Sequence, residues 1–494
     1  MHSYTLEQAR AYESKYAAFI SPQERPAYHL TPMVGWMNDP NGFCFYQGQY
    51  HLFYQYHPYS NQWGPMHWGH AVSSDLLHWT YLPAALAPDS PADRSGCFSG
   101  SAVTLPDGRH LLMYTGVLRT KGPDGLDVDI QNQCLAFGDG RNYEKYSKNP
   151  VIDGSTLPAE FSRADFRDPK LWVEPDGSLR CVVANRTSDG SGAILLFSSP
   201  DGTAWKLESI LDRSYNEYGR MWECPDFFPL DGKYILMVNP QDMSSLGTEF
   251  HNGNNTACIV GSYDAQACRF SRESISAVDH GLDFYAAQTT LAPDGRRIMV
   301  AWMQNWDALG GQPTDQKWFG QMTLPRELHL KDGRLIQTPV REIEALWGRK
   351  VSYSGVRIHE ETTLQGVYGR TIDLTVNIRP QGEDSYSLFR IKFALGSQHY
   401  TSISYRPQGS EVHLNRDHSG YNRDYNHRRK CQVRNQDGCV KLRILLDRFS
   451  AEIFVNDGEQ VLSSVLYTPL TADGISFVAD GNAIIDVEKY EILL

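Results

Sequence analysis

The sequence predicts an all-β protein, a five-bladed β-propeller followed by a C-terminal β-sandwich. The first observation is a set of five tight turns, in each of which a glycine follows a chemically distinctive position by nine residues. The second is that apolar, β-prone runs flank all of these turns, as in antiparallel hairpins. The third is a change near residue 354, after which alternating strands continue but the regular offset is lost.

The five turns define a repeated unit. Their glycines are separated by steps of 55 to 69 residues and are Gly48, Gly108, Gly177, Gly232 and Gly295. The residues nine positions earlier are Asp39, Ser99, Asp168, Glu223 and Ala286, the last directly after Tyr285. With weaker strand signals between the hairpins, each unit holds about four strands, as a propeller blade does. The first strand of a blade lines the central channel, so we expect the five positions to converge on one funnel at the axis.

Length predicts more than one folded unit, because 494 residues are too many for a single compact core. We expect a helical leader, a propeller, a linker and a sandwich, with the boundaries 1–25, 26–340, 341–353 and 354–494. The leader is polar and helix-prone between Thr5 and Ala18, and it lacks the basic start and apolar centre of a signal peptide.

Composition excludes several classes of function. The formal net charge of −12 disfavours a nucleic-acid partner, and no apolar run approaches the length that crosses a membrane. Nine cysteines without close paired spacing indicate reduced thiols in a cytoplasmic protein. Neither a Gly-rich phosphate loop nor a dinucleotide fingerprint is present, so we expect no cofactor. The basic stretch 427–430 is interpreted as a solvated loop.

Three carboxylates share the repeated position, and each has a structural alternative. Asp39 in Asp-Pro-Asn-Gly and Asp168 in Asp-Pro-Lys both have the sequence of a plain turn. Glu223 is less easily explained in this way, because Glu is a poor turn former and stands between Trp222 and Cys224. The coincidence of all three at one position favours a shared site, since buried carboxylates are costly and seldom cluster without a function.

Clustered acids beside aromatic side chains fit glycosyl transfer. This reaction needs an ionised carboxylate at the anomeric carbon and a protonated acid at the leaving oxygen. We assign Glu223 as the acid, because apolar neighbours would favour its neutral form, and Asp39 as the nucleophile. Asp168 would hold sugar hydroxyls, with Arg167 keeping it ionised. Flat apolar faces would come from Trp36, Trp63, Phe98, Trp302 and Trp306, of which about half are expected in the core, and neutral hydrogen-bonding groups from Asn38, Gln55, Ser99, Tyr285 and Gln288.

A group of histidines in the first repeat suggests a metal site as an alternative. These histidines straddle predicted strands and turns, whereas metal ligands converge on one point with a supporting shell. We therefore expect no metal at His51, His57, His67, His70 and His78.

Eight motifs occur in order along nearly the whole chain: Trp36-Met-Asn-Asp-Pro-Asn-Gly, Tyr54-Gln-Tyr-His-Pro, Trp63-Gly-Pro-Met-His-Trp-Gly-His, Phe98-Ser-Gly-Ser, Phe166-Arg-Asp-Pro-Lys, Glu223-Cys-Pro-Asp, Asp283-Phe-Tyr-Ala and Met322-Thr-Leu-Pro-Arg-Glu-Leu. Together they resemble the motifs of glycoside hydrolase family 32, the β-fructofuranosidases. This family is known as a five-bladed propeller followed by a β-sandwich, which agrees with the fold predicted from the turns.

The resemblance implies a retaining double displacement. Asp39 would attack the fructosyl C2, Glu223 would protonate the glycosidic oxygen and later activate water, and Asp168 would bind fructose hydroxyls. The implied activity is that of an exo-acting β-fructofuranosidase of the invertase type, releasing the terminal fructosyl residue of sucrose, sucrose-6-phosphate or short fructo-oligosaccharides. Further residues that match family positions around the fructosyl unit are Asn38, Gln55, Trp63, Phe98, Ser99, Arg167, Tyr285 and Trp306.

Several alternatives remain open at the level of sequence. Another sugar, rather than water, would resolve the same intermediate in a fructosyl transferase. A five-bladed arabinan-type hydrolase would invert configuration, and a non-catalytic sugar-binding propeller or sensor would have no reason to keep both Asp39 and Glu223. A phosphate-selective site needs a basic rim, for which Lys170, Arg220 and Lys317 are candidates. The sequence does not indicate the oligomeric state or the role of the second unit. We expect that unit to cover an apolar flank of the propeller.

Overall fold

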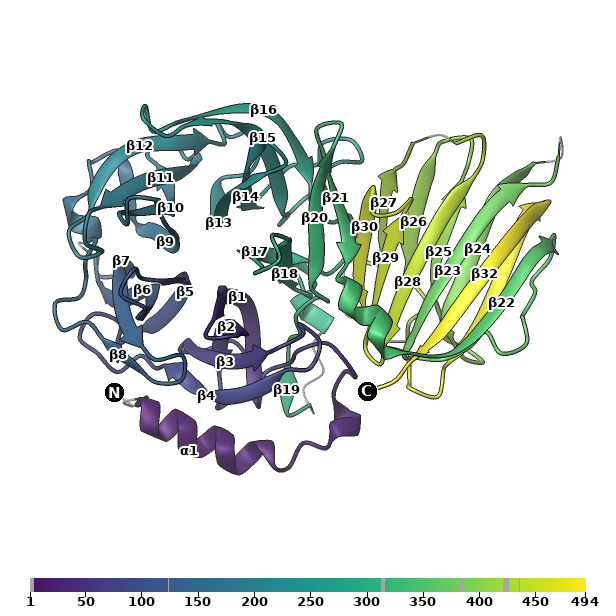
Figure 1. Cartoon of the computed structure of the whole chain (residues 1–494), viewed down its shortest axis with the longest axis horizontal. Helices are drawn as coiled ribbons and strands as arrows, with labels where there is room; N and C mark the ends of the chain where they lie inside the picture. The colour runs from purple at the N-terminus through teal and green to yellow at the C-terminus, as the bar shows by residue number, and fades with distance from the viewer. Residues whose placement is uncertain (1–3, 123, 312–315, 383–384, 421–425, 435) are drawn as a thin grey trace.

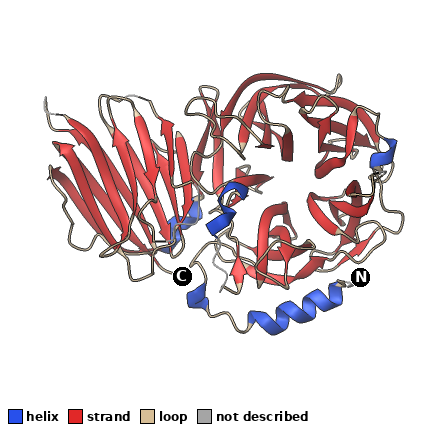
Figure 2. Ribbon diagram, turned by 180° about the vertical axis from the view of Figure 1, so that it is seen from behind, coloured by secondary structure: helices blue, strands red, loops and turns tan. Residues whose placement is uncertain are grey.

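The computed structural model describes residues 4–122, 124–311, 316–382, 385–420, 426–434 and 436–494. Strands dominate these residues, so the predicted all-β class is confirmed (Figure 2). The chain forms two parts that lie side by side: five sheets in a ring over residues 35–339, and two further sheets over residues 347–492 (Figure 1).

The predicted N-terminal helix is present as α1 (Leu6–Ala17), while residues 1–3 of the expected leader lie outside the described residues. A capping box between Thr5 and Gln8 begins the helix, which then runs along the outside of the first sheet (Figure 2). Arg10 and Glu13 both hydrogen-bond the backbone of Ala84 in that sheet, at 2.9 and 2.8 Å. A short 3₁₀ turn, η1 (Pro22–Glu24), leads into the ring.

The five sheets of the ring follow one another in chain order, with the first strand of each nearest the centre (Figure 1). Neighbouring strands within each sheet are antiparallel, except for β19 (Trp318–Phe319), which pairs parallel to β1. The sheets comprise β1 (Gly35–Tyr46), β2 (Gln49–His57), β3 (His67–Ser73) and β4 (Thr80–Leu86); β5 (Gly96–Thr104), β6 (His110–Lys121), β7 (Asp127–Gly138) and β8 (Tyr143–Lys145); β9 (Phe161–Val173), β10 (Leu179–Thr187), β11 (Gly192–Ser199) and β12 (Lys206–Arg213); β13 (Met221–Leu230), β14 (Lys233–Gln241), β15 (Ala257–Asp264) and β16 (Arg269–Ala277); and β17 (Tyr285–Leu291), β18 (Arg297–Trp302), β20 (Arg326–Lys331) and β21 (Arg334–Pro339). The connections also contain the 3₁₀ turns η2 (Gly154–Thr156) and η3 (Trp306–Gly311).

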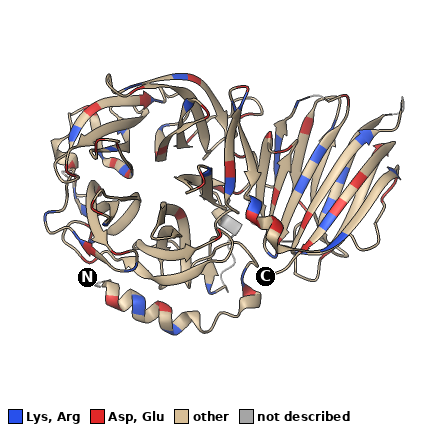
Figure 3. Cartoon of the chain, viewed as in Figure 1, with Lys and Arg blue, Asp and Glu red and all other residues tan. Residues whose placement is uncertain are grey.

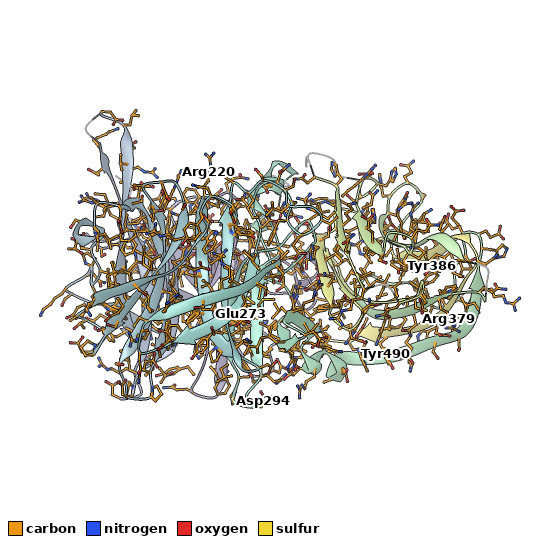
Figure 4. All side chains as sticks on the ribbon, turned by 90° about the horizontal axis from the view of Figure 1, so that it is seen from above. Arg220, Glu273, Asp294, Arg379, Tyr386 and Tyr490 are labelled. Atoms are coloured by element: carbon orange, nitrogen blue, oxygen red, sulfur yellow. The ribbon has the colours of Figure 1, made fainter. Side chains whose placement is uncertain are left out.

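The five predicted hairpin turns join the first and second strands of the five sheets. Their glycines all have φ between 82° and 87°, a left-handed conformation that glycine adopts without a steric penalty. Seen edge-on, Asp294 in the β17–β18 turn lies at one face of the ring, and Arg220, just before β13, lies at the opposite face (Figure 4). The starts of the first strands and their hairpin turns therefore belong to opposite faces.

The second part consists of two antiparallel sheets with a shared apolar core. One core cluster contains Leu374 and Val376 from the first of these sheets together with Phe389 and Ile391 from the second. The first sheet has the order β22 (Trp347–Ile358), β32 (Ala483–Ile492), β23 (Ile372–Pro380), β28 (Val440–Asp447), β29 (Ser450–Val455) and β30 (Gln460–Val465), and the second has the order β27 (Arg428–Gln432), β26 (Glu411–Asn415), β25 (Thr401–Arg406), β24 (Tyr386–Leu395) and β31 (Gly474–Gly481).

One part of the expected linker and most of one expected loop are strands. The expected linker at 341–353 contains the 3₁₀ helix η4 (Arg341–Leu346) and then the start of β22. The basic stretch 427–430 is not a loop, because most of it belongs to the edge strand β27. Alternation along that strand exposes Arg428 and Lys430, which pair with Asp417 and Glu411, and charges of this kind protect an open sheet edge.

Buried charges join the two parts. Arg326 of β20 binds Glu452 of β29 and Asp279, and His29 contacts both Asp447 and Glu452. Apolar residues of both parts pack beside this network, including Leu324 and Phe454. The interface therefore contains a fully buried ionic network beside the apolar contacts.

Three general features bear on the sequence-based expectations. All nine cysteines are free, and six of them are buried. No helix among the described residues is long and apolar enough to cross a membrane. Acidic and basic residues are interspersed over the strands of both parts in the view of Figure 3.

Candidate active site

A β-bulge occurs at the repeated position, or directly after it, in all five sheets of the ring. The pairing of the first and second strands shifts between Met37 and Pro40, and equivalent shifts flank Ser99, Asp168, Cys224 and Ala286. A bulge inserts an unpaired residue and re-aims its side chain, which is how the strands present polar groups near the axis. The equal offset in sequence therefore corresponds to an equal irregularity in structure.

The carboxyl groups of Asp39 and Asp168, from the first and third units of the repeat, are linked by short contacts through Cys224. Ser99 Oγ donates to Asp39 Oδ2 at 2.7 Å, and Asn38 Nδ2 donates to Asp39 Oδ1 at 3.0 Å. The thiol of Cys224 lies 3.4 Å from Asp39 Oδ2 and 3.6 Å from Asp168 Oδ2. Burial raises the pKa of this thiol well above its usual value, so it remains a neutral S–H donor between the two carboxyl groups.

Asp168 is the most buried of the three acids, with 5 % of its surface exposed. Its backbone has φ +65° in the bulge, a conformation that costs about 1–3 kcal/mol for a residue other than glycine. Burial raises the pKa of Asp168 to about 7, opposed by Arg167, while the charges of Glu223 and Asp39 raise it further. The Cys224 backbone N–H donates to its Oδ2 at 2.9 Å.

Glu223 is held by three polar neighbours. Arg167 donates to Oε1 from Nε and Nη2 at 3.1 and 2.9 Å, while Gln241 and Tyr285 donate to Oε2 at 2.8 and 2.7 Å. The sequence-based reason for its role as an acid, a set of apolar neighbours, is wrong, because Trp222 and Cys224 adjoin it in the chain but its oxygens contact polar groups. Its side chain keeps 16 % of its surface exposed and faces the cavity.

Arg167 lies among several acceptors. Besides Glu223, it contacts Asp165 Oδ1 at 3.1 Å and Gln131 Oε1 at 3.4 Å. Although burial lowers the pKa of Arg167, the charges of Glu223 and Asp168 outweigh this effect and raise it. Its guanidinium therefore stays charged in the site.

One cavity of about 370 Å³ contains almost all of the predicted site residues. This volume lies within the range of about 300–1,000 Å³ typical of small-molecule sites. Its lining includes Asn38, Asp39, Gln55, Trp63, Phe98, Ser99, Arg167, Asp168, Glu223 and Trp306. Three larger cavities, of about 600, 520 and 410 Å³, lie beneath α1, between the two parts and beside β9 and β10, but none of them contains this set of carboxylates.

Tyr285 is the predicted site residue that does not line this cavity. It is fully buried, and its hydroxyl reaches Glu223 from behind. The other predicted hydrogen-bonding residue of this strand, Gln288, binds the backbone of Phe43 and Gly100 and is structural. Both side chains therefore hydrogen-bond other residues of the protein rather than a ligand in the cavity.

Aromatic rings form one wall of the cavity. Trp63 is 47 % exposed and meets Phe98 edge-on with ring centroids 6.2 Å apart. Trp306 of η3 lies against Trp36 and Trp302, both of which are buried. Trp36 and Trp302 are thus core supports, as expected for about half of the aromatic candidates, whereas Trp63, Phe98 and Trp306 present their faces to the cavity.

Several lining residues were not identified from sequence. These residues, which have no place at the repeated position, are Asp129, Gln131, Ala164, Asp165 and Gln241. Gln241 had a detectable signal, because a strand that follows the β13–β14 turn must return beside Glu223. Asp129 and Gln131 come from β7, and no sequence pattern indicated that the third strand of a sheet reaches the site.

The histidines of the first repeat do not converge on one point. His51 Nδ1 lies 3.0 Å from His70 Nε2, whereas His57 and His67 bind backbone carbonyls and His78 binds Asp75. Within the described ranges, no group of three or more His, Cys, Asp or Glu side chains has the arrangement to hold a metal ion.

Comparison with known proteins covers almost the whole chain. The family described as "Glycosyl hydrolases family 32 N-terminal domain" matches residues 29–339, and "Glycosyl hydrolases family 32 C terminal" matches residues 342–492. The chain is 39 % identical to a raffinose invertase of Escherichia coli, with 93 % of each chain covered. It is 37 % identical to a sucrose-6-phosphate hydrolase of Zymomonas mobilis, covering 95 % of this chain and 92 % of the relative.

Solved structures show the same likeness. A GH32 β-fructofuranosidase of Bombyx mori has a TM-score of 0.84 and 32 % identity, covering 99 % of this chain and 98 % of that one. A mutant of the same enzyme, in complex with sucrose, gives the same values. A sucrose-6-phosphate hydrolase of Lactobacillus gasseri has a TM-score of 0.85 at 26 % identity, with 99 % of both chains covered.

Proposed function

Since the chain belongs to glycosyl hydrolase family 32 and is a glycoside hydrolase, we propose that it is a retaining, exo-acting β-fructofuranosidase. The substrate would be the terminal, non-reducing β-D-fructofuranosyl residue of sucrose, its 6-phosphate or a short fructo-oligosaccharide. The names of the relatives, an invertase and sucrose-6-phosphate hydrolases, and the sucrose complex of the Bombyx mori enzyme support this substrate class.

The observation that carries the proposal is the gathering of Asp39, Asp168 and Glu223 around one cavity with aromatic walls. Hydrolysis of a glycoside through an oxocarbenium-like transition state uses a carboxylate and a carboxylic acid on the two sides of the scissile bond. The aromatic faces supply apolar contact for a sugar ring, and Asn38, Gln55 and Ser99 supply neutral hydrogen-bonding groups.

In the first step, Asp39 attacks the fructosyl C2 while Glu223 transfers a proton to the departing glycosidic oxygen. The C2–O bond to the leaving sugar breaks as a covalent ester with Asp39 forms. The contacts of Ser99 and Asn38 orient the attacking carboxylate, and Asp168 accepts hydrogen bonds from fructose hydroxyls.

In the second step, the deprotonated Glu223 removes a proton from water, which attacks C2 and releases Asp39. The four hydrogen bonds from Arg167, Gln241 and Tyr285 fix the position of Glu223 through both steps. Arg167 stabilises the negative charge that Glu223 carries between the steps.

Incubation with sucrose and with a short inulin, followed by an assay of free fructose, tests the activity. Release of fructose is expected, and no release from either substrate contradicts the proposal. NMR of the first product tests retention, because a retaining enzyme releases the β anomer before mutarotation. Chromatography at high sucrose distinguishes hydrolysis from transfer, which would yield longer oligosaccharides.

For the fold, we propose that 26–340 is a five-bladed β-propeller and that 354–494 is a β-sandwich, after a leader at 1–25 and with a linker at 341–353. The five consecutive sheets with inner first strands support the propeller, and the core shared by two sheets supports the sandwich. The start of β22 at Trp347 suggests that the second unit begins within the expected linker. A cytoplasmic location remains a prediction.

A further inference from the structure

We propose that the cavity selects uncharged fructosides and discriminates against a substrate that carries a phosphate on the leaving sugar, such as sucrose-6-phosphate. This inference rests on the proposed function and concerns the same site. Sucrose and its 6-phosphate share the fructosyl group and differ by a dianion on the glucosyl group. The question is therefore what charge this dianion meets beside the scissile bond.

The lining of the cavity is strongly acidic. It contains five carboxyl groups, and among its described residues Arg167 is the one cation. The carboxyl groups come from three inner strands and from β7, so they surround the cavity rather than occupying one wall. They are Asp39, Asp129, Asp165, Asp168 and Glu223.

The one cation of the lining is already engaged. Arg167 makes two hydrogen bonds to Glu223, contacts Asp165 at 3.1 Å and lies 3.9 Å from Asp168. Only 11 % of its side chain is exposed. A phosphate that bound Arg167 would have to displace Glu223 or Asp165 and would leave these carboxylates without their partner.

The basic residues that sequence suggested for a phosphate site are placed elsewhere or engaged. The side chain of Lys170 is 12 % exposed and donates to Asp226 and to the carbonyl of Thr289. Lys317 donates to the carbonyl of Phe19 and lies near Glu24, in the cavity beneath α1. Arg220 is exposed at the face of the ring and is not part of the lining (Figure 4).

A further cation, which lies outside the lining, is neutralised by one of the lining acids. Arg119 of β6 binds both oxygens of Asp129 on β7, at 2.8 and 3.1 Å. Specific phosphate sites in proteins are built from arginine forks, lysines or backbone N–H groups that are free to bind the ligand. In the described part of the lining, no such cation is free.

The carboxyl groups of the lining also interact electrostatically with one another. Glu223 and Asp39 both raise the pKa of Asp168 beyond the effect of burial, because their negative charges lie close to its carboxyl group. A phosphate dianion brought within a Debye length of these charges is repelled, and this repulsion weakens as salt is added. Uncharged sucrose experiences no such repulsion.

The test is a comparison of kcat/KM for sucrose and for sucrose-6-phosphate, with free fructose as the common product. We expect kcat/KM to be at least about tenfold higher for sucrose in low salt, and the ratio to narrow as sodium chloride is raised from about 20 to about 200 mM. Equal values, or a preference for the phosphate, overturn the inference while the proposed function stands. Absence of fructose from both substrates overturns the proposed function and the inference with it.

A pair of variants tests the physical cause. Asp129→Asn removes one acid from the lining and frees Arg119, so the ratio of the two kcat/KM values should shift several-fold toward the phosphate. Asp127→Asn is the matched control, because Asp127 lies two residues away on β7, pairs with Lys121 at 2.7 Å and does not line the cavity. If the ratio of the two kcat/KM values is unchanged in Asp129→Asn, or shifts equally in both variants, the charge of the lining does not cause the preference for sucrose.

Discussion

The guanidinium of Arg326, on β20, and the carboxylate of Glu452, on β29, form an ion pair in which both side chains are fully buried. Glu452 also contacts His29 at 2.9 Å, and Arg326 also binds Asp279 at 3.0 Å. The hydrogen bonds and charges of Asp447 and Glu452 outweigh burial and raise the pKa of His29 to about 9. This network crosses the boundary between the two parts, so their association depends on charge pairing as well as on apolar packing.

Glu452→Gln should lower the free energy of unfolding by about 3–5 kcal/mol, because it leaves Arg326 and His29 buried without their common partner. Urea unfolding measures the change. Glu273→Gln is the control, since Glu273 pairs with Lys233 at 2.8 Å on the surface, where both side chains are 44 % exposed (Figure 4). We expect a change of less than about 1 kcal/mol there. Equal losses in both variants would argue against a dominant role of the buried network.

Glu223→Gln should reduce kcat for sucrose by about 10²–10⁴-fold, since glutamine cannot donate the proton that the leaving oxygen needs. A β-fructofuranoside with a nitrophenol leaving group should lose much less activity, because that group departs without protonation. Steady-state rates on both substrates measure the difference. If both substrates lose activity equally, Glu223 does not act as the general acid.

Tyr285→Phe removes one hydrogen bond to Glu223 while leaving the lining of the cavity unchanged. A hydrogen bond to a charged group contributes about 1.5–3 kcal/mol, so kcat should fall about 10- to 100-fold with KM nearly constant. Tyr114→Phe is the control, because Tyr114 is also buried and donates to a carboxylate, Asp93, that does not line the cavity. A similar loss of activity in this control would assign the effect to packing.

Asp168→Asn should make the protein more stable at neutral pH. The folded-state pKa of about 7 exceeds the ordinary value of 3.8, so the native state binds this proton more tightly than the unfolded state does. The resulting stability is fully present below pH 3.8 and is lost as the pH rises through 7. The variant should therefore exceed wild type by up to about 4 kcal/mol above pH 7 and match it near pH 4. Urea unfolding at both pH values measures this, and a variant that is less stable at pH 8 would contradict the prediction.

Acid should destabilise the packing around His51 and His70 in the first sheet of the ring. Burial lowers the pKa of His51 to about 4, and that of its neighbour His70 well below 6.5. Unfolding lets both side chains take up a proton, so their contribution to stability is complete above pH 6.5 and is lost as the pH falls toward 4. His51→Gln should flatten this pH dependence in urea unfolding, whereas replacement of the exposed His78 should not. Equal slopes for wild type and His51→Gln would contradict the assignment.

The sequence predicted the positions of the inner strands because glycine is the residue that adopts the positive φ of the five hairpin turns without strain. Counting back from the turns located Asp39, Asp168 and Glu223 on equivalent strands. The bulges at those positions were not predictable, because the residues that adopt positive φ there, such as Cys224 and Ala286, have no local preference for it. Tertiary contacts impose these conformations.

The partners of the acids were less predictable than the acids themselves. Asp129 reaches the cavity from the third strand of its sheet, where side-chain direction depends on a strand register that a single sequence does not reveal. Glu223 was expected in apolar surroundings because its neighbours in the chain are apolar, although its partners in space are polar. The strand β27 was mistaken for a loop, since its edge position lets it carry an almost continuous run of charge.

Because Trp36 pairs in parallel with Phe319, the first sheet of the ring can be completed only late in synthesis. The ribosome makes Asp39 among the first residues, yet the strand that carries it lacks one neighbour until nearly three hundred more residues have emerged. Contacts of such long range form slowly, because a long chain must close before they are made. A nascent chain stalled before residue 318 would therefore contain every proposed catalytic side chain, but β1, which carries Asp39, would lack its pairing with β19.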